Sequence, residues 1–357
     1  MDRITFIMSV LNTRKSWIKR AVDSVLNQTS DNWELIIVDD GSNKETADYL
    51  DEIGKMENRI RVHHQEKQGL SVARNYGMDN ATGRWVTFID ADDWIEETYV
   101  EEILNQLKSR PDIEMISFGH DDIWPDRIVK HLWGDEELHV FSVSDKDGML
   151  MSLLQQPEEL QAYPMYFGAQ WKFVYSLEFL NKYEIRNIPG LYKAQDSVFN
   201  LYAVNYATKM IYYNKILYHY FHNSESVTGG GFNRDFTRLQ RLVMSYSQFL
   251  QETGKMEDIR FKVAYKRIAL MRFEVAISSY FLHRDNPDIK ETKKAKMIEL
   301  LNVEPYCSLP RMYGYSGLSL YYRLLMLFVK RNAYGSILLL YKVKLYKRSR
   351  SKKLRMP

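Results

Sequence analysis

The chain has 357 residues, 45% of them hydrophobic and 13% aromatic, which is enough to bury a sizeable core in about two domains. Its single cysteine, Cys307, excludes an internal disulfide framework and a thiolate-bound metal cluster, and it favours a reducing compartment. The net charge of +3 combines two unlike parts: no Asp or Glu follows Glu304 but 12 Lys and Arg do, which leaves the first 304 residues at −9.

The first hundred residues alternate between strand and helix patterns. We expect buried strands at residues 4–11, 33–40, 59–65 and 84–90, and amphipathic helices at residues 16–28, 44–56 and 70–81. This alternation predicts a parallel α/β sheet with right-handed crossovers. The apolar run at the N-terminus is short and lacks a cleavage site, so we expect a strand there and not a signal peptide, in a cytoplasmic protein.

The pattern is looser between residues 112 and 228. It indicates shorter strands at residues 114–120 and 209–221 and helices at residues 145–154 and 196–207. The glycine run at residues 228–234 predicts a hinge, because ordering three glycines costs backbone entropy. We therefore expect one domain over residues 1–228, with halves 1–110 and 111–228, and a mainly helical domain over residues 229–357.

Two apolar stretches near the C-terminus, residues 317–330 and 334–348, are shorter than the about 18–20 residues that span a bilayer. Both combine Leu, Phe and Tyr with Lys or Arg, which is typical of helices in a membrane interface. The pattern does not separate two alternatives: the helices bind an anionic membrane surface, or they pack on the domain core and only the final basic residues are solvated.

Carboxylates follow two of the predicted strands. Asp39 and Asp40 end the second strand, and Asp90, Asp92 and Asp93 follow the strand at residues 84–90. Parallel α/β sheets bind ligands beyond the carboxyl ends of their strands. Solvated loops explain a single acidic pair, but two groups at equivalent strand ends favour a site for Mg²⁺ or Mn²⁺, which prefer oxygen ligands and would relieve the repulsion.

Four segments carry a resemblance to a known family: "VLNQT", "VDDGS", "GLSVARN" and "DADDW". In this order they resemble the N-terminal half of family 2 glycosyltransferases, closely over about the first hundred residues and loosely to Thr228. The resemblance implies the GT-A fold, an α/β architecture with a Rossmann-like, mostly parallel sheet flanked by helices. No Walker-type loop and no G-x-G-x-x-G after a strand are present, which disfavours P-loop ATP hydrolysis and the usual mode of NAD binding.

The resemblance also implies roles for residues of the N-terminal half. Asp40, with Asp39 beside it, corresponds to the aspartate that hydrogen-bonds the nucleotide base, usually uracil. Arg74 corresponds to a contact with the nucleotide-sugar. Asp90 and Asp92 correspond to the D-x-D motif, with Asp92 as the main metal ligand.

For three further residues the match to the family's motifs is less complete. Asp93 is a neighbour expected to contact the sugar, and Asp196 corresponds to the general base, although Gln195 replaces the usual Glu. The alternative for Asp196 is a helix N-cap without a catalytic role. His219 or His222 could complete the metal shell, but a histidine among aromatic residues is more often structural.

These roles imply an inverting, metal-dependent transfer of a sugar from a nucleotide-diphosphate donor, a UDP-sugar, to a hydroxyl of a saccharide or lipid-linked saccharide in surface polysaccharide synthesis. We expect the basic tail to hold the enzyme at the inner face of the plasma membrane. Two alternatives stay open: a non-catalytic scaffold that retains the fold, and a nucleic-acid-binding protein, which the acidic body disfavours. A glycosidase is a weaker alternative, since its paired carboxylates would flank a sugar ring.

Overall fold

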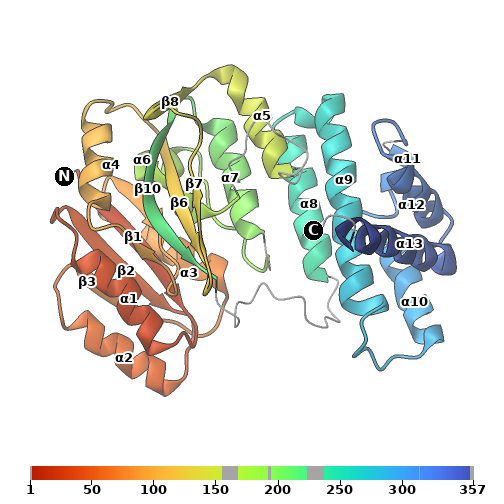
Figure 1. Cartoon of the computed structure of the whole chain (residues 1–357), viewed down its shortest axis with the longest axis horizontal. Coiled ribbons are helices and arrows are strands. Elements are labelled where there is room, and N and C mark those ends of the chain that lie inside the picture. Colours follow the sequence, from red (N-terminus) through yellow and green to blue (C-terminus); the bar gives the residue numbers. More distant parts are fainter. Residues whose placement is uncertain (1, 155–167, 192–193, 223–236, 313, 354–357) are drawn as a thin grey trace. The chain divides into compact units, whose positions relative to one another are not determined.

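The computed structural model describes residues 2–154, 168–191, 194–222, 237–312 and 314–353 (Figure 1). The chain divides into two compact units, Met1–Val227 and Thr228–Pro357, and each is described by itself. The glycine run at residues 228–234, where the sequence predicts a hinge, lies outside the described residues.

Among its described residues, the first unit contains a 10-stranded sheet (Figure 1). Eight strands follow the order β3-β2-β1-β4-β9-β6-β10-β5, while β7 pairs with β6 and β8 pairs with β10. The strands are β1 (Ile4–Val10), β2 (Trp33–Asp39), β3 (Ile60–His64), β4 (Trp85–Phe88), β5 (Trp94–Ile95), β6 (Met115–Ile123), β7 (Ile128–His131), β8 (Leu138–Phe141), β9 (Phe173–Ser176) and β10 (Met210–Phe221).

The direction of the strands decides where their ends meet. Strands β3, β2, β1 and β4 are parallel, as the sequence predicts. Strand β9, which the sequence analysis did not predict, is antiparallel to both β4 and β6, and β6 is parallel to β10. Strands β6 and β10 therefore run in the same direction as β1 to β4. All six have their carboxyl ends at one edge of the sheet, here called the carboxyl edge.

Helices cover both faces of this sheet. They are α1 (Lys15–Leu26), α2 (Lys44–Gly54), α3 (Leu70–Asp79), α4 (Tyr99–Lys108), α5 (Val143–Leu154), α6 (Leu177–Lys182) and α7 (Gln195–Tyr206). Alternate β1 residues such as Phe6 and Met8 join one core cluster with residues of α1, α2 and α4. Ile7 points to the other face, where it meets Gly77 of α3. A Cβ atom at Gly77 would lie 2.4 Å from Ile7 Cγ2, so the glycine lets α3 lie directly against β1.

The second unit is helical in its described residues. Its α-helices are α8 (Thr237–Glu252), α9 (Ile259–Ala276), α10 (Lys290–Leu301), α11 (Leu309–Met312), α12 (Leu320–Lys330) and α13 (Tyr334–Lys353). Helices α8 and α9 contribute large buried side chains to its core, among them Tyr246, Phe261 and Phe273. A mainly helical C-terminal region is therefore confirmed.

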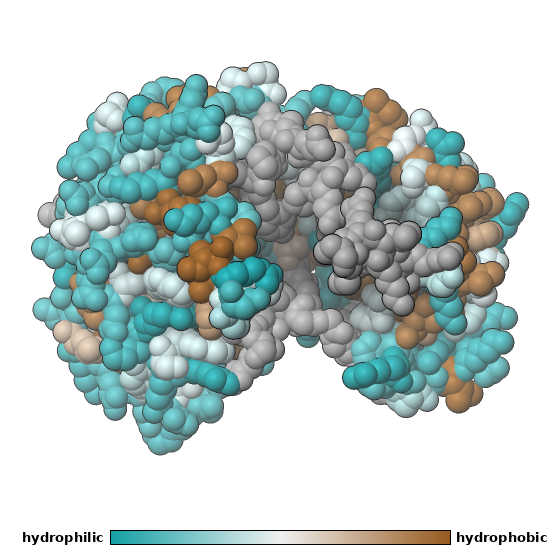
Figure 2. Space-filling model, in the orientation of Figure 1, coloured by the Kyte–Doolittle hydropathy of each residue, from teal (hydrophilic) through white to brown (hydrophobic). Residues whose placement is uncertain are grey.

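Both apolar C-terminal stretches form helices that bury one face and expose another. Helix α12 buries Leu325, Met326 and Val329. Helix α13 buries Ile337 but leaves Leu339 65% exposed. Figure 2 shows brown hydrophobic residues among teal hydrophilic ones on the visible surface of this unit. Among the described residues, none of the helices combines the length and the apolar character needed to cross a membrane.

Candidate active site at the carboxyl edge

The acidic pair at the end of β2 is buried and organises the loop that leads into α3. Asp40 is 3% exposed and accepts hydrogen bonds from Gln65 Nε2 (2.8 Å) and from the backbone N–H groups of Gln68 (2.7 Å) and Gly69 (2.8 Å). In this structure Asp40 therefore fixes the start of α3. The base contact that the resemblance implies for Asp40 stays a prediction.

Asp39, beside it, is also buried and has two partners. One carboxylate oxygen accepts from the backbone N–H of Ser42 (3.0 Å), and the other lies 2.8 Å from His64 Nδ1. The hydrogen bond to Asp39 raises the pKa of His64, and burial opposes this effect. Asp39 thus links the end of β2 to the end of β3.

Arg74 of α3 is the centre of the site. Its side chain is 3% exposed, and its guanidinium group donates to Asp196 Oδ1 (2.6 Å), Gln170 Oε1 (2.6 Å) and Asp90 Oδ1 (2.9 Å). The guanidinium carbon also lies 5.3 Å from the centre of the Phe88 ring. A buried charge is stable only when it is paired and hydrogen-bonded. The fold therefore brings together three of the residues that the sequence analysis selected.

Carboxylate repulsion remains in this arrangement. Burial raises the pKa of Asp90 to about 6, Arg74 opposes the shift, and the charges of Asp92 and Asp196 add to it. Asp92 follows Asp90 in the same loop and is half-buried. The loop thus holds several carboxylates close together, with the cations of Arg74 and Arg20 beside them.

Two further residues support the site, Arg20 at the acidic loop and Gln170 at Arg74, and the sequence analysis predicted neither. Arg20 of α1 donates to the backbone oxygen of Asp92, with its guanidinium group 4.1 Å from the Trp94 ring and 4.4 Å from the Phe221 ring. Gln170, which is fully buried, reaches Arg74 from a short 3-10 helix at Gln170–Lys172. No local pattern marks either residue, because their roles arise only when distant segments meet.

Asp93 differs from its neighbours because it is fully buried. Its oxygens accept from Tyr218 Oη (2.6 Å) and from the backbone N–H of Phe221 (2.7 Å). Burial raises the pKa of Asp93 well above its ordinary value, and Asp90 and Asp92 add to the shift. In this structure Asp93 anchors β10 to the acidic loop and presents no surface to a sugar, which argues against the predicted contact.

Asp196 lies near the start of α7, but it is not the N-cap. That position belongs to Ala194, which has φ 57° and makes no side-chain capping bond. The carboxylate of Asp196 is 19% exposed and binds Arg74, and its other oxygen lies 3.4 Å from the backbone N of Gln170. The N-cap alternative is therefore wrong, and the general-base role that the resemblance implies for Asp196 stays a prediction.

His219 is held by groups other than the D-x-D carboxylates. Its Nε2 lies 3.0 Å from Glu96 Oε1, its Nδ1 lies 3.4 Å from Asp121 Oδ2, and its ring stacks on Trp94 at 5.2 Å. These contacts account for the position of His219 without a metal ion. A metal-binding role for His219 stays a prediction.

A buried Arg-carboxylate centre thus lies at the carboxyl edge of a mostly parallel α/β sheet, the edge at which such folds bind ligands. Residues 5–167 match the model of Glycosyl transferase family 2. The N-terminal part of the chain therefore carries a family 2 glycosyltransferase domain, and its fold is of the GT-A type.

Individual relatives agree with this assignment. The putative glycosyltransferase EpsH of Bacillus subtilis is 29% identical over 264 residues, which are 72% of each chain. The putative teichuronic acid biosynthesis glycosyltransferase TuaG of the same organism is 39% identical over 97 residues, 27% of this chain and 38% of that protein. The crystal structure of S. aureus TarS 1-349 in complex with UDP-GlcNAc has a TM-score of 0.68, covering 97% of this chain and 92% of that one. At 14% identity this likeness shows the fold alone.

Proposed function

We propose that the chain transfers a sugar from a UDP-sugar donor to a hydroxyl group of a saccharide or lipid-linked saccharide, with inversion at the anomeric carbon. The observation that carries the proposal is the group formed by Arg74, Asp90 and Asp196 at the carboxyl edge, beside Asp92. The TarS structure with UDP-GlcNAc supports the choice of donor. The name of TuaG supports a role in the synthesis of a surface polymer.

The acidic loop fits a divalent cation. Asp90 and Asp92 offer hard oxygen ligands of the kind that Mg²⁺ and Mn²⁺ prefer. Burial and the charges of Asp92 and Asp196 raise the pKa of Asp90, and a bound cation would offset this by stabilising the ionised carboxylate. When bound, such an ion supplies Lewis-acid stabilisation of the leaving nucleoside diphosphate. Arg74 orients the Asp90 carboxylate on the side away from solvent.

Asp196 suits the general base. The attacking hydroxyl must lose its proton as it reaches the anomeric carbon, and a positioned carboxylate can accept it. Arg74 and the backbone N of Gln170 hold the Asp196 carboxylate in place, and its 19% exposure leaves it accessible to an acceptor. Displacement with a single base inverts the anomeric configuration. The scaffold alternative, based on Gln195, predicts the same fold without turnover.

We place the enzyme on the inner face of the plasma membrane as a peripheral protein. Four residues of α13 at helical spacing, Leu339, Lys342, Val343 and Tyr346, are exposed, which gives the helix an apolar surface with a basic residue. Such a surface inserts shallowly among lipid headgroups while its cations bind anionic lipids.

The direct test is release of UDP from a panel of UDP-sugars with Mn²⁺ and candidate acceptors. We expect Asp92→Asn to lower turnover by about 100-fold or more through loss of leaving-group stabilisation, and Asp196→Asn by about 10²–10⁴-fold through loss of the base. Asp48→Asn on α2, a carboxylate 56% exposed, is the matched control and should keep wild-type turnover. Release of UDP that is insensitive to both site variants would reject the assigned residues, and no turnover with any donor would favour the scaffold.

A further inference from the structure

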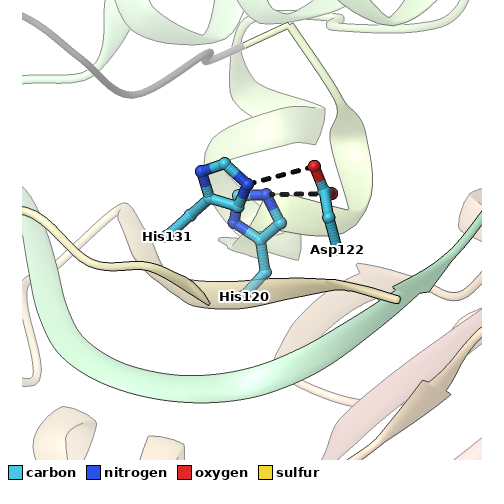
Figure 3. Close-up of side chains that lie close together, drawn as sticks. All are labelled: His120, Asp122 and His131. Carbon is cyan, nitrogen blue, oxygen red and sulfur yellow. Dashed lines mark hydrogen bonds and ion pairs between the residues drawn. The ribbon is translucent and has the colours of Figure 1, made fainter. Parts of the chain in front are cut away.

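A second cluster of potential metal ligands lies on β6 and β7, outside the acidic loop (Figure 3). His120 and Asp122 are two residues apart on β6 and so share one face of the sheet, and His131 pairs with His120 across the β6–β7 hairpin. Their ligand atoms all lie within 4.8 Å of one another. In Figure 3 both imidazole rings are directed at the Asp122 carboxylate.

The end of β10 adds a third imidazole. His222 Nε2 lies 3.4 Å from Asp122 Oδ1, and it is a buried atom without a hydrogen-bond partner among the residues that the structure describes. The His222 ring is fixed by stacking on Trp124, with ring centres 3.6 Å apart, and its backbone N–H donates to Ile123 O (2.9 Å). Three histidines therefore surround one carboxylate, and one of them has an unsatisfied nitrogen.

The spacing of these atoms suits a small cation. Ligands about 2.0–2.1 Å from a tetrahedral metal ion lie about 3.3 Å from one another. The nitrogens of His131, His222 and His120 lie 3.0, 3.4 and 3.9 Å from an Asp122 oxygen, so these distances bracket that value. His120, Asp122 and His131 would have to close from within 4.8 Å of one another, and His222, which lies near Asp122, would have to approach the other two imidazoles.

His120 is the most buried member of the cluster, at 7% exposed, and Lys172, at 4% exposed, is a neighbouring cation.

We propose that His120, Asp122 and His131, with His222 as a fourth ligand, bind one divalent transition-metal ion of the zinc class, separately from any ion at Asp90 and Asp92. Imidazole nitrogens with one carboxylate select Zn²⁺, Co²⁺ or Ni²⁺ over Mg²⁺ and Mn²⁺, which prefer all-oxygen sites. The two sites of this chain therefore differ in ligand chemistry.

A metal ion at this cluster would have a structural role. It would join the β6–β7 hairpin to the end of β10, the strand whose Tyr218 and Phe221 hold Asp93 of the acidic loop. Trp171 lies between the two regions, since it contacts the His120 ring edge-on at 5.1 Å and stacks on Tyr218 at 4.2 Å. A bound ion would thus fix the strand end that supports the catalytic edge.

The test is a titration of the metal-free, full-length protein with Co²⁺, followed by its visible absorption, which reports nitrogen ligation. We expect one saturable equivalent in the wild type and in Asp92→Asn, displaced by Zn²⁺ and not by excess Mg²⁺. Asp122→Asn and His131→Asn should each weaken binding by at least about tenfold. His63→Asn, on β3, is the control for binding by a histidine outside the cluster and should behave as wild type.

Thermal unfolding supplies a second readout that does not depend on activity. Zn²⁺ should raise the Tm of the wild type and of Asp92→Asn but not of His131→Asn, whose side chain is 40% exposed and whose metal-free fold should be intact by circular dichroism. The proposal is overturned if the wild type shows no saturable Co²⁺ band, or if the band disappears in Asp92→Asn and persists in both Asp122→Asn and His131→Asn.

Discussion

Arg74 joins three parts of the candidate site through one side chain. It is the buried cation between Asp90 and Asp196, and it also binds Gln170, so it joins α3, the acidic loop and α7. A lysine would supply the charge and three N–H donors, but all from one nitrogen, whereas the planar guanidinium group donates from Nη1 to Asp196 and Gln170 and from Nη2 to Asp90. Arginine at this position thus follows from the geometry of its partners.

We predict that Arg74→Met destabilises the protein by about 3 kcal/mol, because it leaves two carboxylates in a buried site without a counter-charge. Arg74→Lys should recover part of this loss. Urea unfolding of the three proteins at neutral pH measures the effect. If the urea unfolding curves of wild type and Arg74→Met had equal midpoints and slopes, the ion pairs of Arg74 would not stabilise the fold as predicted.

Glu34 is a buried acid at the opposite edge of the sheet. Burial alone would raise its pKa, but hydrogen bonds from Thr5 and Thr82 and the charge of Arg61 outweigh burial, so the pKa is lowered from 4.5. A lowered pKa means that the ionised group stabilises the fold above pH 4.5 and that this contribution disappears as the pH falls through the folded-state value.

We therefore expect Glu34→Gln to lower the free energy of unfolding by about 1–3 kcal/mol at pH 7 and by progressively less below about pH 4.5. Denaturant titrations across this pH range measure the difference from wild type. Glu45→Gln, at an exposed partner of Lys15, should match wild type throughout. If the destabilisation by Glu34→Gln became larger as the pH falls, the predicted stabilisation by the ionised carboxylate would be refuted.

At the scale of elements, the site depends on how closely α3 approaches the sheet. Gly77 lies against Ile7 of β1, and Arg74 is one turn earlier on the same helix. The position of the guanidinium group is therefore set by the packing of α3 on β1.

Gly77→Ala should destabilise the protein by about 1–3 kcal/mol, because the added methyl group overlaps a β-branched side chain in a tightly packed core. It should also lower UDP release, since α3 must move and carries Arg74 with it. Gly335→Ala on α13, where a Cβ meets no atom within 4 Å, is the matched control and should be neutral or slightly stabilising. Equal effects of the two changes on Tm would refute the close contact.

At the scale of the whole molecule, charge is distributed unevenly. The 12 Lys and Arg after Glu304 contrast with the −9 of the preceding residues. A chain with this asymmetry is attracted to anionic surfaces through one end only. The exposed residues of α13 lie in the basic end.

For that reason the protein should bind vesicles that contain anionic lipid, and less so as salt increases. Replacing Lys342 and Lys347 by Gln should weaken binding by about 2 kcal/mol, roughly 30-fold, in a vesicle co-sedimentation assay. The double change Lys44→Gln and Lys108→Gln, in the first unit, keeps the same net charge and should bind like wild type. Equal weakening by both pairs would show that only net charge matters.

Much of the fold could be predicted from the sequence. The four parallel strands β1 to β4 and the helices between them carry continuous or periodic apolar patterns, and each was predicted close to its observed bounds. The strands β5, β7, β8 and β9 were not predicted, because they are short, and β7 and β8 are partly exposed. Short strands take their conformation from the neighbours with which they pair.

The site was divided in the same way. Asp90 and Asp92 were selected because a spaced motif contains them, and Asp196 because its own segment resembles one of the family, whereas Arg20 and Gln170 were not selected because neither lies in such a segment. The burial of Asp93 was also not predicted. Asp93 directly follows Asp92, and nothing in this local sequence distinguishes a buried residue from a solvated loop residue. Its two hydrogen bonds come from β10, more than a hundred residues away.

The sequence by itself determined the α/β class, because local periodicity predicts strands and helices. It also determined the family and the acidic residues at the strand ends, because short motifs in a fixed order identify them. Only the tertiary structure decided which carboxylates share Arg74, which one is buried, and that His120, Asp122, His131 and His222 converge. These outcomes depend on strand direction and register. Strand β9 lies between β4 and β6 and is antiparallel to both, so β6 runs in the same direction as β4. A local sequence pattern does not predict which strands will be neighbours in the sheet.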